Sequence, residues 1–248
     1  MLLVHLQISL YRRLFLPVEL RFVIGHFLLR KLNNESIKDA GRRYEERTIN
    51  LLYGPIEWWD TSEVTSMYEL FMHSKHFNKD ISNWDVSKVT TMKKMFMYAD
   101  RFNSPLETWD VSNVTDMDNM FCCALTFNQP LSKWNVCNVQ IMHSLFNGAS
   151  CFNQPLNDWD VSNVTQMNYM FYDAKLFNQS LNHWNVSKVK CMDGMFASCF
   201  SFNQSLEDWD VSNVIQYNQM FFGAKQVIFH SWKQKNPNLF LSIQSCMK

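Results

Sequence analysis

Tryptophan recurs every 25 residues along this chain, without insertion or deletion, at Trp59, Trp84, Trp109, Trp134, Trp159, Trp184 and Trp209. A fixed period of this kind is the sequence signature of a repeat architecture, in which each unit packs against its neighbours. If tryptophan is numbered position 1 of a unit, position 6 is always Val and position 13 is always Phe. Residues 58–224 therefore form a domain of seven repeats, and their shared pattern has to fold the same way seven times.

The first half of each unit has the apolar spacing of a helix. Positions 6, 9, 12, 13 and 16 are apolar in most units, as in Val114, Met117, Met120, Phe121 and Ala124. Steps of three and four residues place such side chains on one stripe of a short helix of about three turns at most. Position 4 is Ser in six units, where it is expected to cap the N-terminus of that helix.

The end of each unit predicts a strand. From position 23 to position 3 of the next unit the chain reads Leu-x-x-Trp-x-Val, as in Leu131, Trp134 and Val136, which is the spacing of a leucine-rich-repeat strand with inward-facing apolar residues. A helix between two parallel strands supplies a crossover of sufficient length, and such crossovers are right-handed. The predicted fold class is thus α/β: a right-handed leucine-rich-repeat-like solenoid of seven strand-plus-short-helix units with a helical N-terminal cap.

Two polar columns accompany the apolar ones. Position 20 is Asn in six units, from Asn78 to Asn203, and we expect these amides to bond the backbone of neighbouring turns; ligand binding is the alternative. Position 2 alternates between Asp and Asn. It is interpreted either as a hydrogen-bond acceptor for the turn into the predicted helix or as an acidic stripe that meets a basic partner. Its candidate partner-binding members are Asp85, Asp110, Asp160 and Asp210.

Position 25 varies along the array, whereas the invariant apolar columns are occupied by packing. A variable exposed position on the predicted strand is better suited to specific recognition of a protein partner. The candidate partner-binding residues at position 25 are Thr108, Lys133, Asp158, His183 and Asp208.

Charge and composition exclude several classes of function. The chain has no net charge, but by count residues 58–224 hold ten Lys and Arg against 17 Asp and Glu, which argues against nucleic acid as a partner. No apolar run reaches the length of a transmembrane segment, and the basic residues follow the first apolar run rather than preceding it as in a secretory signal. Seven scattered cysteines without a C-x-x-C pair suit free thiols. These features predict an intracellular, cytoplasmic protein.

No motif for catalysis is present. The seven histidines occupy unrelated repeat positions, and neither H-E-x-x-H, G-x-S-x-G nor a P-loop occurs. We therefore expect no enzymatic activity, no catalytic residues, no cofactor and no metal site; the methionine columns are interpreted as core rather than as copper ligands.

The repeat pattern, written W-D-V-S-N-V-T-x-M-x-x-M-F-x-x-A-x-x-F-N-Q-P-L, resembles the 25-residue repeat of unknown function found in mycoplasma lipoproteins and other surface proteins. That family is related to the BspA-like leucine-rich repeats. The resemblance implies a binding or adhesion scaffold and assigns no catalytic residues. A cell-surface adhesin is one functional hypothesis that follows from it.

Residues 1–57 and 225–248 lie outside the repeat and are expected to cap its two ends, the first of them with helices. Within the N-terminal part, Leu16, Pro17, Leu20 and Ile24 resemble the start of an F-box, a motif that binds the Skp adaptor of cullin ubiquitin ligases. This resemblance implies a substrate receptor. The leading hypothesis remains a non-enzymatic protein–protein interaction scaffold with an unidentified protein partner.

Overall fold

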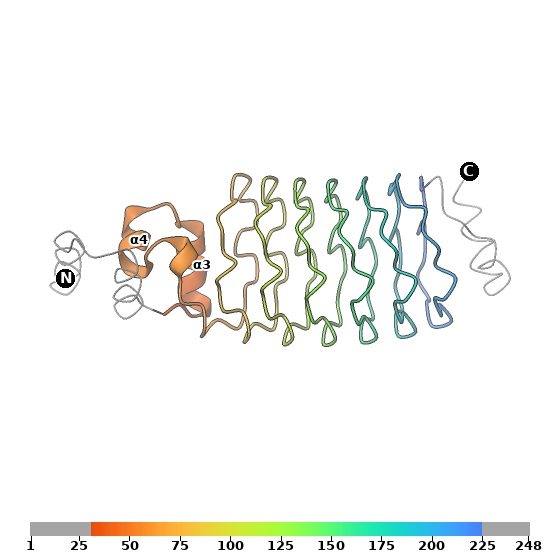
Figure 1. Ribbon diagram of the computed structural model, residues 1–248, viewed down its shortest axis with the longest axis horizontal. Coiled ribbons are helices and arrows are strands. Elements are labelled where there is room, and N and C mark those ends of the chain that lie inside the picture. The colour runs from red at the N-terminus through yellow and green to blue at the C-terminus, as the bar shows by residue number, and fades with distance from the viewer. Residues whose placement is uncertain (1–30, 225–248) are drawn as a thin grey trace.

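The computed structural model describes residues 31–224. Most of this range forms a row of coils that follow one another along the long axis of the molecule (Figure 1). Helices α3 (Asn34–Arg42) and α4 (Arg47–Tyr53) and a short 3-10 helix (Ile56–Trp58) precede the coils. Each coil corresponds to one 25-residue unit, so the period in the sequence is the step of the stack.

The predicted α/β architecture is wrong. Within residues 31–224, the only helices are α3, α4 and the 3-10 helix, all of which lie before the repeats. The only β-structure in the same range is a series of isolated parallel bridges between successive residues at position 8: Ser66, Thr91, Asp116, Ile141, Gln166, Cys191 and Gln216. The chain is therefore no leucine-rich-repeat-like solenoid of strand-plus-helix units, and its coils consist of turns.

Alternating hydrogen bonds replace the predicted helix. In the third coil, the N–H groups of Met117 and Asn119 donate to the next coil, to the carbonyls of Ile141 (3.0 Å) and His143 (2.8 Å). The next N–H, of Met120, donates three residues back to Met117 (3.1 Å), whereas an α-helix bonds four residues back.

Left-handed backbone at two positions of every coil also prevents the predicted helix from forming. Positions 11 and 15 have positive φ throughout, for example Asn119 at 57° and Cys123 at 56°. A right-handed helix cannot continue through such residues. The serine at position 4 consequently has no helix to cap, and the Ser87 hydroxyl donates instead to Oδ1 of Asp85 at 2.6 Å.

Two successive turns replace the predicted strand. The Trp134 N–H donates to the Leu131 carbonyl (3.1 Å), and the Val139 N–H donates to the Val136 carbonyl (2.9 Å). Each bond joins residues three apart, which closes a turn and prevents an extended backbone. The inward orientation of Leu131, Trp134 and Val136 is nevertheless confirmed, since all three are buried.

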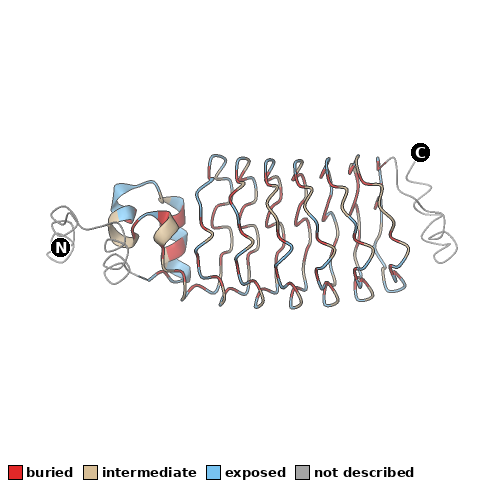
Figure 2. Ribbon diagram, in the orientation of Figure 1, coloured by how far each residue is buried: buried red, intermediate tan, exposed pale blue. Residues whose placement is uncertain are grey.

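Aromatic columns form the core of the stack. The rings of Phe121 and Phe146 are 5.7 Å apart, and the rings of Trp134 and Trp159 are 6.3 Å apart and nearly parallel. Each large ring buries on the order of 150–250 Å², which contributes roughly 4–6 kcal/mol at about 25 cal/mol per Å². Buried and exposed segments alternate along the coils (Figure 2), as expected when every coil turns the same residues inward.

Each tryptophan from Trp109 onward also bonds the coil before it, whereas the indoles of Trp59 and Trp84 donate to Gly54 and Ile56, ahead of the first coil. The Trp134 Nε1 donates to the Leu106 carbonyl at 2.8 Å, and this carbonyl also accepts the Trp109 N–H at 3.1 Å. Both lone pairs of a buried carbonyl are thereby satisfied. The same indole bond recurs along the array, so the tryptophan column fixes the register as well as filling the core.

Helix α3 meets the first coil through one asparagine. Oδ1 of Asn34 accepts the N–H groups of Thr65 (2.8 Å) and Ser66 (3.0 Å). In the second coil the equivalent N–H, of Thr90, donates to the carbonyl of Thr65 at 2.9 Å. The side chain of Asn34 thus stands where a preceding coil would place a backbone acceptor.

Candidate interaction surfaces

The predicted partner-binding residues at position 25 lie on the surface, at the tips of the turns before each tryptophan. Thr108, Lys133, Asp158, His183 and Asp208 are all exposed. Several of them contact the neighbouring coil: Lys133 pairs with Glu107 at 3.2 Å, and the Asp208 carboxylate accepts a bond from the side-chain amide of Asn182. The side chains of this column are accessible to solvent, and some of them also bond the neighbouring coil.

The position 2 column forms the turn that follows each tryptophan. Oδ1 of Asp110 accepts the Ser112 N–H at 3.0 Å, and Oδ1 of Asn135 accepts the Cys137 N–H at 3.3 Å. The interpretation of this column as a turn acceptor is therefore confirmed, and it explains why Asp and Asn exchange freely.

The same turns lower the pKa of three of these carboxyls. At Asp85 the Ser87 hydroxyl has the largest effect, followed by the Ser87 N–H, and both bonds hold the pKa below its usual value. Serine two residues on has the same effect on the pKa values of Asp160 and Asp210. These carboxylates are exposed and remain ionised at neutral pH, as an acidic stripe would require.

The asparagines at position 20 form a ladder between coils, as predicted. Oδ1 of Asn128 accepts the Asn153 N–H at 2.9 Å, and the Asn128 N–H donates to Oδ1 of Asn103 at 2.9 Å. The column therefore holds the stack together through its amide oxygens, which accept bonds from the following coil.

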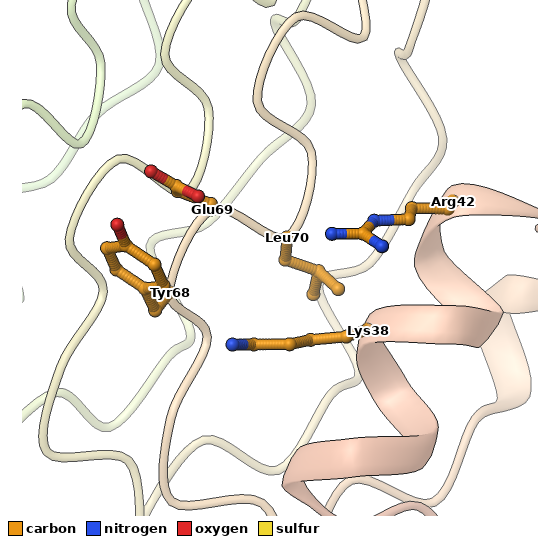
Figure 3. A pocket seen from close by; sticks show the side chains of 5 residues that line it. All are labelled: Lys38, Arg42, Tyr68, Glu69 and Leu70. Carbon is orange, nitrogen blue, oxygen red and sulfur yellow. The ribbon is translucent and has the colours of Figure 1, made fainter.

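A small hollow lies where α3 meets the first coil (Figure 3), between Lys38, Arg42, Tyr68, Glu69 and Leu70. The polar side chains that line the hollow contact one another. Nζ of Lys38 lies 5.2 Å from the centre of the Tyr68 ring. The Tyr68 hydroxyl bonds the carboxylate of Glu69 and lowers the pKa of that carboxyl. We interpret this hollow as the junction between helix and coil rather than as a ligand site.

Several large apolar side chains remain exposed at positions 11 to 18, which the sequence interpretation did not identify as a surface. Positions 11 to 18 of the last three coils carry large apolar residues that are 38 to 54% exposed, and together we call them the apolar edge: Tyr169, Tyr172, Leu176, Phe200 and Phe222. The rings of Tyr169 and Tyr172 meet edge to face at 6.0 Å. A signal existed in the sequence, because these positions vary between units and hold large apolar residues mainly towards the C-terminal end.

Several further predictions concern absences or the chain ends. Among residues 31–224, no three His, Cys, Asp or Glu side chains lie close enough together to hold a metal ion. In the same range no helix has both the length and the apolar character needed to cross a membrane. The adaptor-binding candidates Leu16, Pro17, Leu20 and Ile24 lie outside the described residues.

Comparison with known proteins places the repeats in a family. The family described as "Mycoplasma protein of unknown function, DUF285" matches residues 42–150 and again residues 126–232. The two matches overlap by one repeat length and together span more than half of the chain, as expected of a repeat family. No curated protein matches the chain. The chain therefore belongs to DUF285, the family of Mycoplasma proteins of unknown function.

Proposed function

We propose that this chain is a non-enzymatic protein-interaction scaffold that binds its partner through the apolar edge of the last three coils. The observation that carries this proposal is the exposure of Tyr169, Tyr172, Leu176, Phe200 and Phe222 on an array whose other apolar side chains are mostly buried. Large apolar side chains that remain exposed on a folded protein and lie near one another, as Tyr169 and Tyr172 do, usually mark a site of interaction.

The chemistry of the apolar edge suits a protein partner. Tyrosine and phenylalanine offer large contact areas at low entropic cost, and aromatic residues are enriched where interfaces derive most of their binding energy. The surrounding array is acidic, with 17 Asp and Glu against ten Lys and Arg in residues 58–224. We therefore expect a partner segment with apolar anchors and basic flanking residues, whose encounter the negative field would accelerate.

In this proposal the two predicted polar columns contribute less to partner binding than the apolar edge does. Position 2 serves turns, and part of position 25 bonds the neighbouring coil. Both columns remain exposed, so they are alternative binding positions, and the same experiment tests the one at position 25.

A peptide library displayed on phage tests the proposal while the natural partner is still unidentified. The library is selected on the intact protein and then compared on a variant carrying Tyr172→Ser, Leu176→Ser and Phe200→Ser. These side chains are about 40–55% exposed, so their replacement should leave the stack folded. Peptides enriched on the intact protein should bind the variant at least about tenfold more weakly, which corresponds to about 1.4 kcal/mol.

Matched controls locate the surface. Ile215→Ser removes a 72% exposed apolar residue that lies outside the apolar edge, and it should leave binding unchanged. A second control replaces Lys133, Asp158 and His183 by Ser at position 25. If peptides bind the apolar-edge variant as well as the intact protein but lose affinity for this second control, the apolar edge is the wrong surface.

A further inference from the structure

Two adjacent cysteines in the third coil form a thiol pair. Their Sγ atoms are 3.9 Å apart; Cys122 is buried and Cys123 is partly exposed. Their backbone is fixed on both sides of the stack, because the Cys122 carbonyl accepts the Tyr98 N–H (2.8 Å) and the Cys123 N–H donates to the Asn147 carbonyl (2.6 Å). The two thiols therefore keep this arrangement as long as the coils stay stacked.

The next coil leaves room for the sulfur of Cys123. Cys123 occupies position 15, and the residue at this position in the following coil is Gly148. A Cβ atom on Gly148 would lie 3.0 Å from the Cys123 Sγ, which is closer than a carbon and a sulfur normally approach. The glycine thus provides the space into which the thiol of Cys123 extends.

The hydrogen bond between the two thiols shifts their pKa values in opposite directions. The Cys122 thiol donates to the sulfur of Cys123, which lowers the pKa of Cys123 to about 7, while partial burial and the carboxylates of Asp100 and Asp173 act in the opposite direction. The bond also raises the pKa of Cys122, as does burial. In contrast, burial raises the pKa of Cys199 to about 12.

From this geometry we infer that Cys123 is a modification site, at which the chain takes up a low-molecular-weight disulfide by thiol–disulfide exchange. The thiolate of Cys123 attacks one sulfur of the disulfide. A new S–S bond forms at Cys123, the original S–S bond breaks, and the second half of the reagent leaves as a thiolate. The disulfide reagent itself is the oxidant, so no further reactant is needed.

The reaction should end as a mixed disulfide on Cys123. Adjacent residues joined by a trans peptide bond have Cα atoms about 3.8 Å apart, below the roughly 4.4–6.8 Å that disulfides span. The described residues contain no cis peptide bond. Closure between Cys122 and Cys123 is therefore disfavoured, and Cys122 acts as a positioning residue that stabilises the thiolate beside it.

The expected rate follows from two opposing effects. At pH 7 a thiol of pKa about 7 is half ionised, against about 3% for an ordinary thiol of pKa about 8.5. Part of this advantage is lost, because nucleophilicity falls with pKa. We expect Cys123 to react about threefold faster at pH 7 than an ordinary exposed thiol. Cys151, which is exposed, provides the comparison within the same chain.

The experiment treats the full-length folded protein with glutathione disulfide over pH 6 to 9 and locates the adducts by fragment mass spectrometry. The adduct on Cys123 should form with a half-maximal rate near pH 7. In Cys122→Ala the midpoint for Cys123 should move towards that of an ordinary thiol, and in Cys151→Ala it should not move.

Three results would overturn the inference: equal rates at Cys123 and Cys151 with the same pH profile, a Cys123 profile unchanged by Cys122→Ala, or a mass loss of two protons at the pair, which indicates an internal disulfide. The intact-protein profile needs no variant, so it decides the matter even if Cys122→Ala does not fold.

Discussion

At the scale of the residue, the tryptophan column has two structural roles, since each ring fills the core and each indole N–H from Trp109 onward bonds the coil before it. Trp134→Ala should lower the free energy of unfolding by about 3–5 kcal/mol, because it creates a cavity in the middle of the array. Trp134→Phe should cost less, about 1–3 kcal/mol, because the Leu106 carbonyl still accepts the Trp109 N–H. Urea unfolding measures both.

Trp58 provides the control for this prediction. It lies one residue before the repeat register, in the 3-10 helix, and is only half-buried. Trp58→Ala should therefore lower the free energy of unfolding clearly less than Trp134→Ala. Equal losses would contradict the special role of the column.

The position 2 carboxyls predict how stability depends on pH. Their pKa values are lowered in the folded chain at Asp85, Asp160 and Asp210, so their stabilising contribution is present above the unfolded pKa of about 3.9 and is lost as pH falls through the folded pKa. The triple Asp→Asn variant keeps each turn acceptor and removes the titration. Its urea midpoint should fall less than that of the intact protein between about pH 6 and pH 3. Parallel curves for the two proteins would contradict this account.

At the scale of the element, the asparagine ladder is a chain of side-chain bonds that crosses from coil to coil. In Asn128→Ala the Asn153 N–H and the side-chain amide of Gln154 lose their acceptor, which should cost about 1–3 kcal/mol of unfolding free energy. Asn138→Ala is the matched control: it removes an exposed amide that only donates to the Ser112 carbonyl, and it should cost less. Urea unfolding of both variants tests the ladder, and equal costs would exclude it as a special element.

The turn ladder has its own conformational signature, the left-handed residues at positions 11 and 15. Ser198 has a φ of 57°, so Ser198→Gly should raise the free energy of unfolding by about 0.5–1 kcal/mol through relief of backbone strain. Ser201→Gly in the same coil, where φ is not positive, should lower it. Thermal unfolding of the two variants should thus shift in opposite directions, and shifts of the same sign would show that strain is not the cause.

These elements also show where prediction from the sequence succeeded and failed. Inward columns and the asparagine ladder could be predicted, because each depends on residue identity at a fixed step. The helix could not, because overlapping turns that bond three residues back produce the same apolar spacing as a helical stripe. One signal was available: positions 11 and 15 hold no Val, Ile or Thr in any unit, and they hold Gly148, Gly194 and Gly223. The apolar edge was missed for the same reason, since it lies on the turns that were assigned to the helix.

At the scale of the whole molecule, the stack is one-dimensional, and each coil contacts mainly the coils before and after it. In the first six coils the N–H of each residue at position 9, 11, 13 or 15 donates to the following coil, and the aromatic rings stack in the same direction. Stability should then be close to a sum of equal contributions from coils and their interfaces. This makes the register, rather than the number of coils, the property that the fold depends on.

Deletion of one complete unit tests that property. Removal of residues 134–158 joins Lys133 to Trp159 and restores every column, so the shortened protein should unfold cooperatively in urea, with tryptophan fluorescence as the probe, at a lower free energy of unfolding than the intact protein. Removal of residues 134–146 is the control, because it places Phe and Trp columns out of register across the junction. This second variant should lose the cooperative transition, since mismatched coils can neither stack their rings nor exchange their backbone bonds. If both deletions unfold alike, the coils are not interchangeable units, and the fold depends on contacts that the repeat does not encode.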